Sequence, residues 1–222
     1  FAQIILADEI NRAPAKVQAA LLEAMQEHQV TYGGTGYRLP SPFWILATQN
    51  PIELEGTYPL PEAQLDRFFF KCTVPYPSDE ALLRIADIAL DDEPADRIEC
   101  LLQPGRIETM MRQTRDVVIA DEMKRAAVDL VLATQADRPD VNALAGMHLR
   151  YGASPRAIQA LLRGARVRAL ADGRGHVARE DMRAVALPAL RHRVLLSIAS
   201  AVGVWPMLRR ARGCFPTLRG CE

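Results

Sequence analysis

The chain begins with a short apolar run that ends abruptly in two acids. Residues 4–7 read Ile-Ile-Leu-Ala, and Asp8 and Glu9 follow directly. Because the run is continuous rather than alternating, it predicts a fully buried strand over residues 1–7, as in a parallel sheet. An acid at the tip of such a strand can hold a hydrated Mg²⁺, and a second acid can polarise a water molecule. Asp8 and Glu9 are candidates for these two roles, although most acid pairs of this kind merely face solvent.

A second apolar run ends in an amide. Residues 43–48 predict another buried strand, and Gln49, Asn50 and Pro51 follow it. If the two strands are parallel neighbours, their carboxyl ends share one edge of the sheet, where ligands bind in open α/β folds. Asn50 then lies beside Glu9 and can orient the water that Glu9 activates. The alternative is that Asn50 is only a turn residue before a proline.

Two arginines occupy positions at the start or end of predicted helices. Arg67 ends a short helix predicted over residues 62–67, where a cation can cap helix carbonyls. It can equally act as an arginine finger that stabilises phosphoryl charge in a neighbouring subunit. Arg156 falls in the first turn of a helix that starts after Ser154, and the helix dipole does not favour a cation there. This position favours a contact with nucleotide phosphate.

The remaining pattern divides the chain at about residue 77. Residues 1–77 predict an α/β fold with a partial parallel sheet. Besides the two strands, the expected elements are a helix over 14–27, a hairpin around Gly33–Gly36, a loop over 51–61 and a third strand over 68–74.

Residues 78–196 carry apolar side chains at helical spacing and predict an all-helical domain. Asp121 is expected to cap one helix and Ser154 the helix that begins at Pro155, while Pro188 is expected to kink the last one. Residues 197–222 lose the helical period and predict an irregular tail. Two interpretations of this tail stay open, a product of an altered reading frame and an ordinary flexible C-terminus.

Composition limits the possible partners. The 222 residues carry 27 basic and 27 acidic side chains, so the formal net charge is zero. This disfavours nucleic acid or an anionic membrane as the main partner. The four cysteines show no metal-binding or disulfide spacing, and no apolar stretch is long enough to span a membrane. Arg12 is expected to form a surface salt bridge. We therefore expect a cytoplasmic protein with no nucleic-acid partner and no membrane span.

Several long segments resemble the MoxR-type AAA+ ATPases. The similar segments are residues 7–14, 21–25, 47–51, 55–68, 152–156 and 172–174, in that order. The resemblance extends over roughly residues 1–196 and implies an AAA+ core followed by an all-helical lid domain. It also implies that the hairpin around Gly33–Gly36 corresponds to the insertion that precedes sensor 1 in this family.

The resemblance assigns a role to each candidate residue. It implies that Asp8 is the Walker B acid that binds Mg²⁺ through water, that Glu9 is the catalytic base, and that Asn50 is sensor 1. It implies that Arg67 is the arginine finger and that Arg156 is the sensor 2 arginine of the lid. The implied ligands are ATP and Mg²⁺, and the implied assembly is a ring, expected to be a hexamer. The implied role is chaperone-like assembly of protein complexes or insertion of metal cofactors, often with a von Willebrand A-domain protein as client.

The sequence departs from the family pattern in its first part. No Gly-x-x-x-x-Gly-Lys-Ser/Thr loop, the Walker A motif, occurs in the 222 residues, and the first two strands of the AAA+ core are absent. In that fold the first strand lies between the strands expected here at 43–48 and 68–74, so we expect a gap in the sheet. A second hypothesis therefore stays open, that the chain is a non-enzymatic remnant or partner-binding fragment unable to bind ATP by itself.

Overall fold

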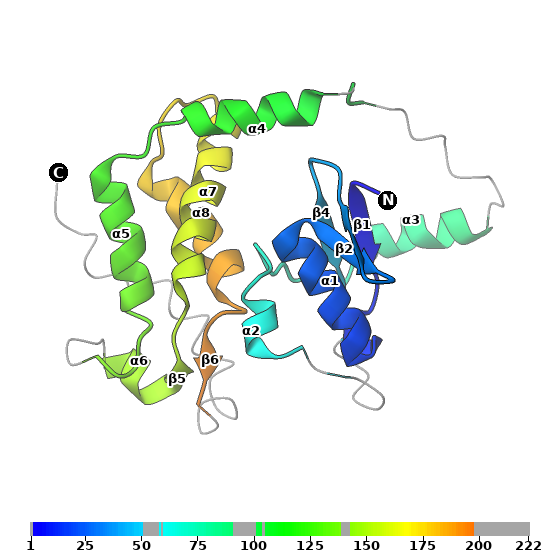
Figure 1. Cartoon of the computed structure of the whole chain (residues 1–222). Coiled ribbons are helices and arrows are strands. Elements are labelled where there is room, and N and C mark those ends of the chain that lie inside the picture. The colour runs from blue at the N-terminus through cyan, green and yellow to red at the C-terminus, as the bar shows by residue number, and fades with distance from the viewer. Residues whose placement is uncertain are drawn as a thin grey trace.

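A computed structural model of the chain describes residues 2–50, 58, 60–90, 101–103, 105–138 and 143–197. In Figure 1 the strands β1 to β4 lie with α1 in one group, and the helices α5, α7 and α8 form another, with α2 between them. Most of the loop predicted at 51–61 and of the tail predicted at 197–222 lies outside the described residues.

The first group contains the predicted pair of parallel strands. Strand β1 (Ile4–Ala7) pairs in parallel with β4 (Trp44–Ala47), in a register that sets Ile4 opposite Trp44 and Ala7 opposite Ala47. Between them lie a 3₁₀ turn (Ile10–Arg12), helix α1 (Ala15–Glu27), and the hairpin of β2 (Gln29–Tyr32) and β3 (Thr35–Arg38). The first two predicted strands, the helix and the hairpin are confirmed.

The hairpin turn needs its two glycines. Gly33 and Gly34 both have positive φ, +59° and +79°, which is the backbone of a type I′ turn. Thr35 and Gly36 already belong to β3, so the turn is shorter than the Gly33–Gly36 segment predicted for it.

The two parallel strands are not fully buried, which corrects the first expectation. Ile4 and Leu6 on β1 and Trp44 and Leu46 on β4 are exposed, whereas the residues between them are half-buried. A strand needs cover on both faces to be fully buried. Within the described residues this two-stranded sheet has one poorly covered face.

The third predicted strand is absent from the structure. Residues 70–78 follow helix α2 (Glu62–Leu65) and the turn after it without any strand pairing. A strand requires a neighbour that completes its hydrogen-bond ladder, and the described residues of β1 and β4 pair only with each other. Only the beginning of the segment contacts the helical part, where the Lys71 amide donates to the Pro188 carbonyl at 2.9 Å and Phe70 packs against the core.

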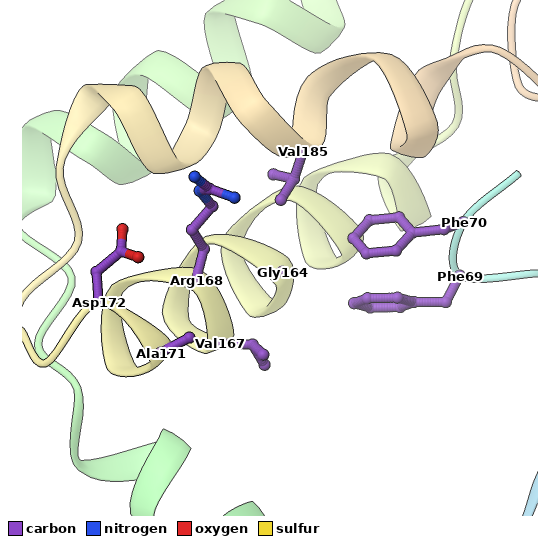
Figure 2. Close-up of a pocket in the computed structure, with 8 residues that line it drawn as sticks. All are labelled: Phe69, Phe70, Gly164, Val167, Arg168, Ala171, Asp172 and Val185. Carbon is purple, nitrogen blue, oxygen red and sulfur yellow. The ribbon is translucent and has the colours of Figure 1, made fainter. Parts of the chain in front are cut away.

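The aromatic rings of this segment face the helices. Phe69 and Phe70 point toward α7 (Pro155–Ala171) and α8 (Arg179–Leu190), as Figure 2 shows. Their ring centroids are 4.4 Å apart. They border a cavity of about 270 Å³ whose lining is largely apolar. It is lined by Phe69, Phe70, Gly164, Val167, Arg168, Ala171, Asp172 and Val185.

The helical part has a core of small side chains. Ala157, Ala160 and Ala165 of α7 are buried with Leu161, and α5 (Asp121–Leu132) contributes Ala127. Alanines at these positions let α7 pack closely against both α5 and α8. The other helices are α3 (Asp79–Leu90), α4 (Arg106–Asp116) and α6 (Ala143–His148). No helix in the described segments has the length and apolar character needed to cross a bilayer.

Local details of this part differ from the prediction at two places. Strands β5 (Leu149–Tyr151) and β6 (Leu195–Leu196) form a small antiparallel pair within the predominantly helical part. The N-cap of α5 is Ala120, so Asp121 is the first residue of the helix and not its cap. The Asp121 carboxylate pairs with Lys124 Nζ at 2.7 Å. Ser154 is the N-cap of α7 as predicted, and its hydroxyl accepts from the Arg156 amide at 3.2 Å.

Replacing Gly164 with alanine is expected to destabilise the protein. A Cβ there would lie 2.7 Å from the ring of Phe70 and 3.3 Å from Val185. The overpacking should outweigh the usual helical gain and lower the unfolding free energy by about 1 kcal/mol. Gly146→Ala on α6 is the matched control, because nothing lies within 4 Å of its added Cβ. If thermal unfolding shows equal stabilisation by both substitutions, Phe70 does not pack against α7 in this way.

Candidate functional site

Thr48 joins the tips of the two parallel strands. Its backbone amide donates to the Ala7 carbonyl at 3.1 Å, and its carbonyl accepts from the Ile10 amide at 3.0 Å. Its hydroxyl donates to Asp8 Oδ1 and accepts from the Glu9 amide at 2.8 Å. The threonine thus fixes both acids at the carboxyl edge of the sheet. Sequence reasoning placed Thr48 only at the strand end and did not assign it this role.

The structure brings Glu9 and Asn50 together. Asn50 Nδ2 donates to Glu9 Oε1 at 3.4 Å, a long hydrogen bond. The other carboxylate oxygen of Glu9 pairs with Arg12 Nε at 3.0 Å, so the salt bridge predicted for Arg12 is confirmed and its partner is Glu9. Glu9 has a left-handed backbone, with φ 47° and ψ 50°. Such a conformation costs about 1–3 kcal/mol for a non-glycine residue and is typical of functional sites.

The exposed carboxylate of Asp8 is suited to a hydrated magnesium ion. Only its Oδ1 has a hydrogen bond within the described residues. Those residues contain no group of three or more His, Cys, Asp or Glu side chains that could hold a metal. Mg²⁺ commonly binds through one or two carboxylates, with water and substrate phosphate completing its coordination. The donor set at this edge fits that pattern.

Two buried amides support the residues around Asn50. Asn11 Nδ2 donates to the Asn50 carbonyl at 3.3 Å, and the Asn11 carbonyl accepts from the Tyr58 amide at 2.6 Å. Gln18 Nε2 donates to the carbonyls of Ile10 and Tyr58. These bonds attach both Asn50 and Tyr58 to the segment that follows Asp8 and Glu9. Sequence reasoning missed both amides, although a glutamine on the apolar face of α1 was a usable signal.

Arg67 lies away from this edge. Its Nη1 donates to Gln26 Oε1, near the end of α1, rather than to the carbonyls of α2. In the described part of the chain it contacts neither Glu9 nor Asn50. The structure therefore separates the sequence candidates. Asp8, Glu9 and Asn50 lie at the sheet edge, and Arg67 lies against α1. Arg156 belongs to a second group at the start of α7.

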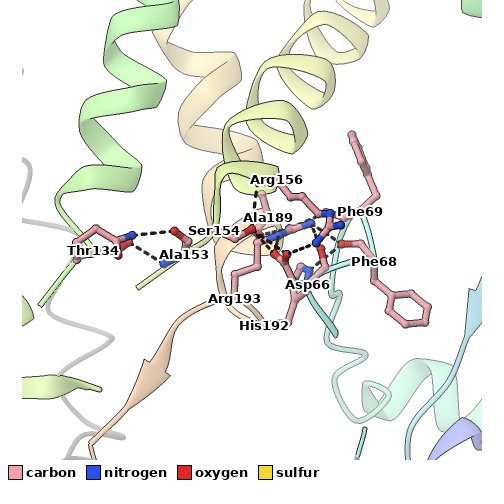
Figure 3. A network of polar contacts seen from close by, with 11 residues as sticks. Asp66, Phe68, Phe69, Thr134, Ala153, Ser154, Arg156, Ala189, His192 and Arg193 are labelled. Carbon is pink, nitrogen blue, oxygen red and sulfur yellow. Dashed lines mark hydrogen bonds and ion pairs between the residues drawn. The ribbon is translucent and has the colours of Figure 1, made fainter. Parts of the chain in front are cut away.

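The second group is built around Asp66, the residue before Arg67. We call Asp66, Ser154, Arg156 and Arg193 the Asp66 cluster, which Figure 3 shows from close by. The Ser154 hydroxyl lies 2.7 and 2.8 Å from the two carboxylate oxygens, Arg156 Nη1 donates to Oδ2 at 3.1 Å, and Arg193 Nε donates to Oδ1 at 3.0 Å. The ion pair with Asp66 explains why a cation is tolerated in the first turn of α7.

Arg193 joins the helical part to the segment after α2. Its side chain is 2% exposed. All five of its N–H groups have acceptors, which are the Asp66 carboxylate and four backbone carbonyls. The carbonyls belong to Asp66, Phe68, Phe69 and Ala189. Sequence reasoning assigned no role to Asp66 or Arg193, because their pairing spans 127 residues and leaves no local pattern.

The electrostatics of the cluster favour an ionised Asp66. Burial by itself would raise the pKa of Asp66, but hydrogen bonds from Ser154 and Arg156 and the charge of Arg193 outweigh that effect. The pKa of Asp66 therefore lies below its ordinary value. Two guanidinium groups share this single carboxylate, so the cluster keeps an excess of positive charge.

The loop before α7 is held from the end of α5. The Ala153 amide donates to Thr134 Oγ1 at 2.9 Å, and Gln135 Nε2 donates to the Ala153 carbonyl at 2.8 Å (Figure 3). At Gly152 a Cβ would lie 2.4 Å from the Thr134 carbonyl oxygen, so a larger residue would displace the loop. This clamp sets the position of Ser154 and Arg156.

Because of His192, stability is expected to decrease as the pH falls below about 6.5, the ordinary pKa of a histidine side chain. Burial lowers the pKa of this imidazole in the folded protein. Its Nε2 contacts the Phe68 carbonyl at 2.9 Å, and its buried Nδ1 has no hydrogen-bond partner among the described residues. The unfolded chain therefore binds a proton that the folded chain does not, and acid favours unfolding. Thermal unfolding measured between about pH 5 and 8 should show the stability falling toward lower pH, and His192→Gln should remove this pH dependence. If the pH dependence of stability is unchanged in His192→Gln, other titrating groups cause it.

Comparisons with known proteins show which proteins this chain resembles. The family model for the "ATPase family associated with various cellular activities (AAA)" matches residues 1–70, and the model for the AAA lid domain matches residues 141–204. Chaperone MoxR1 of Mycobacterium tuberculosis is 42% identical over 200 residues, which are 88% of this chain and 52% of that protein. Protein MoxR of Methylorubrum extorquens is 34% identical over 201 residues, 85% of this chain and 58% of that protein. The chain belongs to the MoxR family of AAA+ ATPases.

A solved structure shares the fold of this MoxR-family chain. It is the crystal structure of a protein from Cytophaga hutchinsonii that carries an ATPase assignment, with a TM-score of 0.86 and 38% sequence identity. The alignment covers 94% of the MoxR-family chain and 64% of the crystallised one. The chain spans little more than half the length of the curated relatives described above. The family and the fold follow from these matches, while the roles of single residues remain proposals.

Proposed function

We propose that this chain carries part of the catalytic site of an ATPase that hydrolyses ATP to ADP and phosphate. The observation that supports this proposal best is the contact of Asn50 with Glu9 at the shared edge of β1 and β4. Glu9 accepts a proton from water while Asn50 orients that water. The water oxygen bonds to the γ-phosphorus and the bond to the ADP oxygen breaks, so ADP leaves.

The other candidate residues act on the negative charge of the nucleotide phosphates. Asp8 would hold Mg²⁺ through water, and the ion would supply charge neutralisation at the phosphates. Arg156 meets nucleotide phosphate from the lid, and Arg67 acts on the nucleotide of an adjoining subunit. Such an action in trans requires a ring, for which we propose six subunits. In the present arrangement Arg12 Nε pairs with Glu9 Oε2, while Oε1 faces Asn50.

We propose that the ATPase drives chaperone-like remodelling of a client protein in the cytoplasm. The support is the similarity to a relative named as a chaperone. Assembly of a protein complex or insertion of a metal cofactor, with a von Willebrand A-domain protein as client, would be consistent with this role. No described contact identifies the client.

The alternative is a non-enzymatic remnant or partner-binding fragment, and ATP binding separates the two hypotheses. We expect a full-length form that carries a phosphate loop to bind Mg-ATP, with Kd in the range of about 1 μM to 1 mM, and to hydrolyse it. Calorimetric titration of that form and of the 222-residue chain tests this expectation. Tight binding by the 222-residue chain would refute the alternative. No binding by the full-length form would refute the ATPase.

A further inference from the structure

The two arginines of the Asp66 cluster differ in how firmly they are held. Arg193 is buried and all of its donors are satisfied, so its release would leave a charge and five N–H groups without partners. Arg156 is 51% exposed and reaches Asp66 through one nitrogen, Nη1. Because the Arg156 guanidinium is half-exposed, water can solvate it when it leaves Asp66, so its release costs less than the release of a buried cation. Arg156 is therefore the mobile partner of Asp66 and Arg193 the fixed one.

The position of Asp66 links the two arginines of the proposed mechanism. Asp66 contacts Arg156 directly, and Arg67 is the next residue in the chain. The Asp66 amide bonds to the Glu62 carbonyl and the Arg67 amide to the Gln64 carbonyl, so both residues belong to one tight turn after α2. The loss or gain of an ion pair by the Asp66 carboxylate therefore affects the same turn that carries Arg67.

We infer that Asp66 is a positioning residue whose ion pair with Arg156 is exchanged for a nucleotide phosphate, and that this exchange is transmitted to Arg67. The inference rests on the proposed function. Without nucleotide, Asp66 holds Arg156 at the start of α7. When a phosphate group binds Arg156, Asp66 keeps Arg193 and Ser154 but loses one cation. Nucleotide binding on one subunit thereby alters the turn that presents the arginine finger to the next subunit.

The first test measures the competition between Asp66 and phosphate. In the full-length protein, Asp66→Asn should lower the Kd for a non-hydrolysable ATP analogue about two- to five-fold, because Arg156 is no longer held by a charge. Asparagine retains an acceptor for Arg193. The gain should vanish in an Arg156→Gln background. Asp129→Asn removes an exposed carboxylate that pairs with Arg125 at 3.2 Å and is the matched control. An unchanged Kd, or the same gain without Arg156, would overturn the inference.

A second test does not depend on the folding of Asp66→Asn. Hydrogen exchange of the full-length protein should change at residues 62–68 when the ATP analogue binds. The Arg156→Gln variant should bind the analogue without that change, since the exchange partner is absent. An identical change in both proteins would overturn the inference. If the full-length protein binds no ATP at all, the proposed function fails; if it binds ATP and residues 62–68 do not respond, only the role of Asp66 fails.

Discussion

Replacing Glu9 with glutamine is expected to reduce ATP turnover by the full-length protein by at least about 100-fold while leaving ATP binding intact. Glutamine has nearly the same size and can still accept a hydrogen bond from Asn50, which lies 3.4 Å from Glu9 Oε1. Glutamine cannot take a proton from the attacking water, so turnover should fall while ATP binding is retained. Phosphate release measures turnover, and calorimetry measures binding.

The control for this prediction is an exposed glutamate outside the site. Glu122→Gln on α5 removes the same charge from the surface of the helical part and should leave turnover unchanged. Turnover by Glu9→Gln at the rate of the parent protein would remove Glu9 from the mechanism. Loss of both binding and turnover would indicate that the substitution disturbs the sheet edge instead.

Replacing Arg193 with methionine is expected to lower the unfolding free energy of the helical part by about 3–5 kcal/mol. The substitution leaves Asp66, which is 12% exposed, without its buried cation, and it leaves four carbonyls without their donor. Thermal unfolding of the 222-residue chain, followed by circular dichroism at helical wavelengths, measures the effect.

An exposed arginine provides the matched comparison. Arg125→Met breaks the pair with Asp129, in which both side chains are more than half exposed, and should change stability by less than about 1 kcal/mol. The double variant Asp66→Asn with Arg193→Met should lose less than the sum of its single changes, because neither partner then leaves a buried charge behind. Equal effects of Arg193→Met and Arg125→Met would contradict the buried pairing.

Part of the site was predictable from the two apolar runs and the residues that follow them. The apolar runs within residues 1–7 and 43–48 predicted two buried strands, and if such strands are parallel neighbours, the residues after them share one edge of the sheet. That reasoning placed Asn50 beside Glu9, and the structure has them in contact. The Ser154 cap was predictable for a similar reason, since a cap is decided by residues within one helical turn.

Predictions that depended on neighbours outside the local pattern failed. Residues 68–74 have the composition of a strand, but no described strand pairs with them, and Phe69 and Phe70 lie beside α7 and α8 instead. The apolar pattern of β1 and β4 indicated burial on both faces, and one face is exposed in the described structure. Composition indicates which secondary structure a segment prefers. Whether a strand finds a partner and whether its faces are buried depend on the elements beside it.

The amino-acid sequence alone determined the two apolar strands, the polar residues Asp8, Glu9 and Asn50 that follow them, and the helical character of the second part. Each of these follows from periodicity and from residues close together in the chain. Only the tertiary structure decided that Asp66 pairs with Arg156 and Arg193. Those partners are 90 and 127 residues away, and a charge pair of that separation leaves no periodic signal. Folding brings them together because burial makes each charge require a partner.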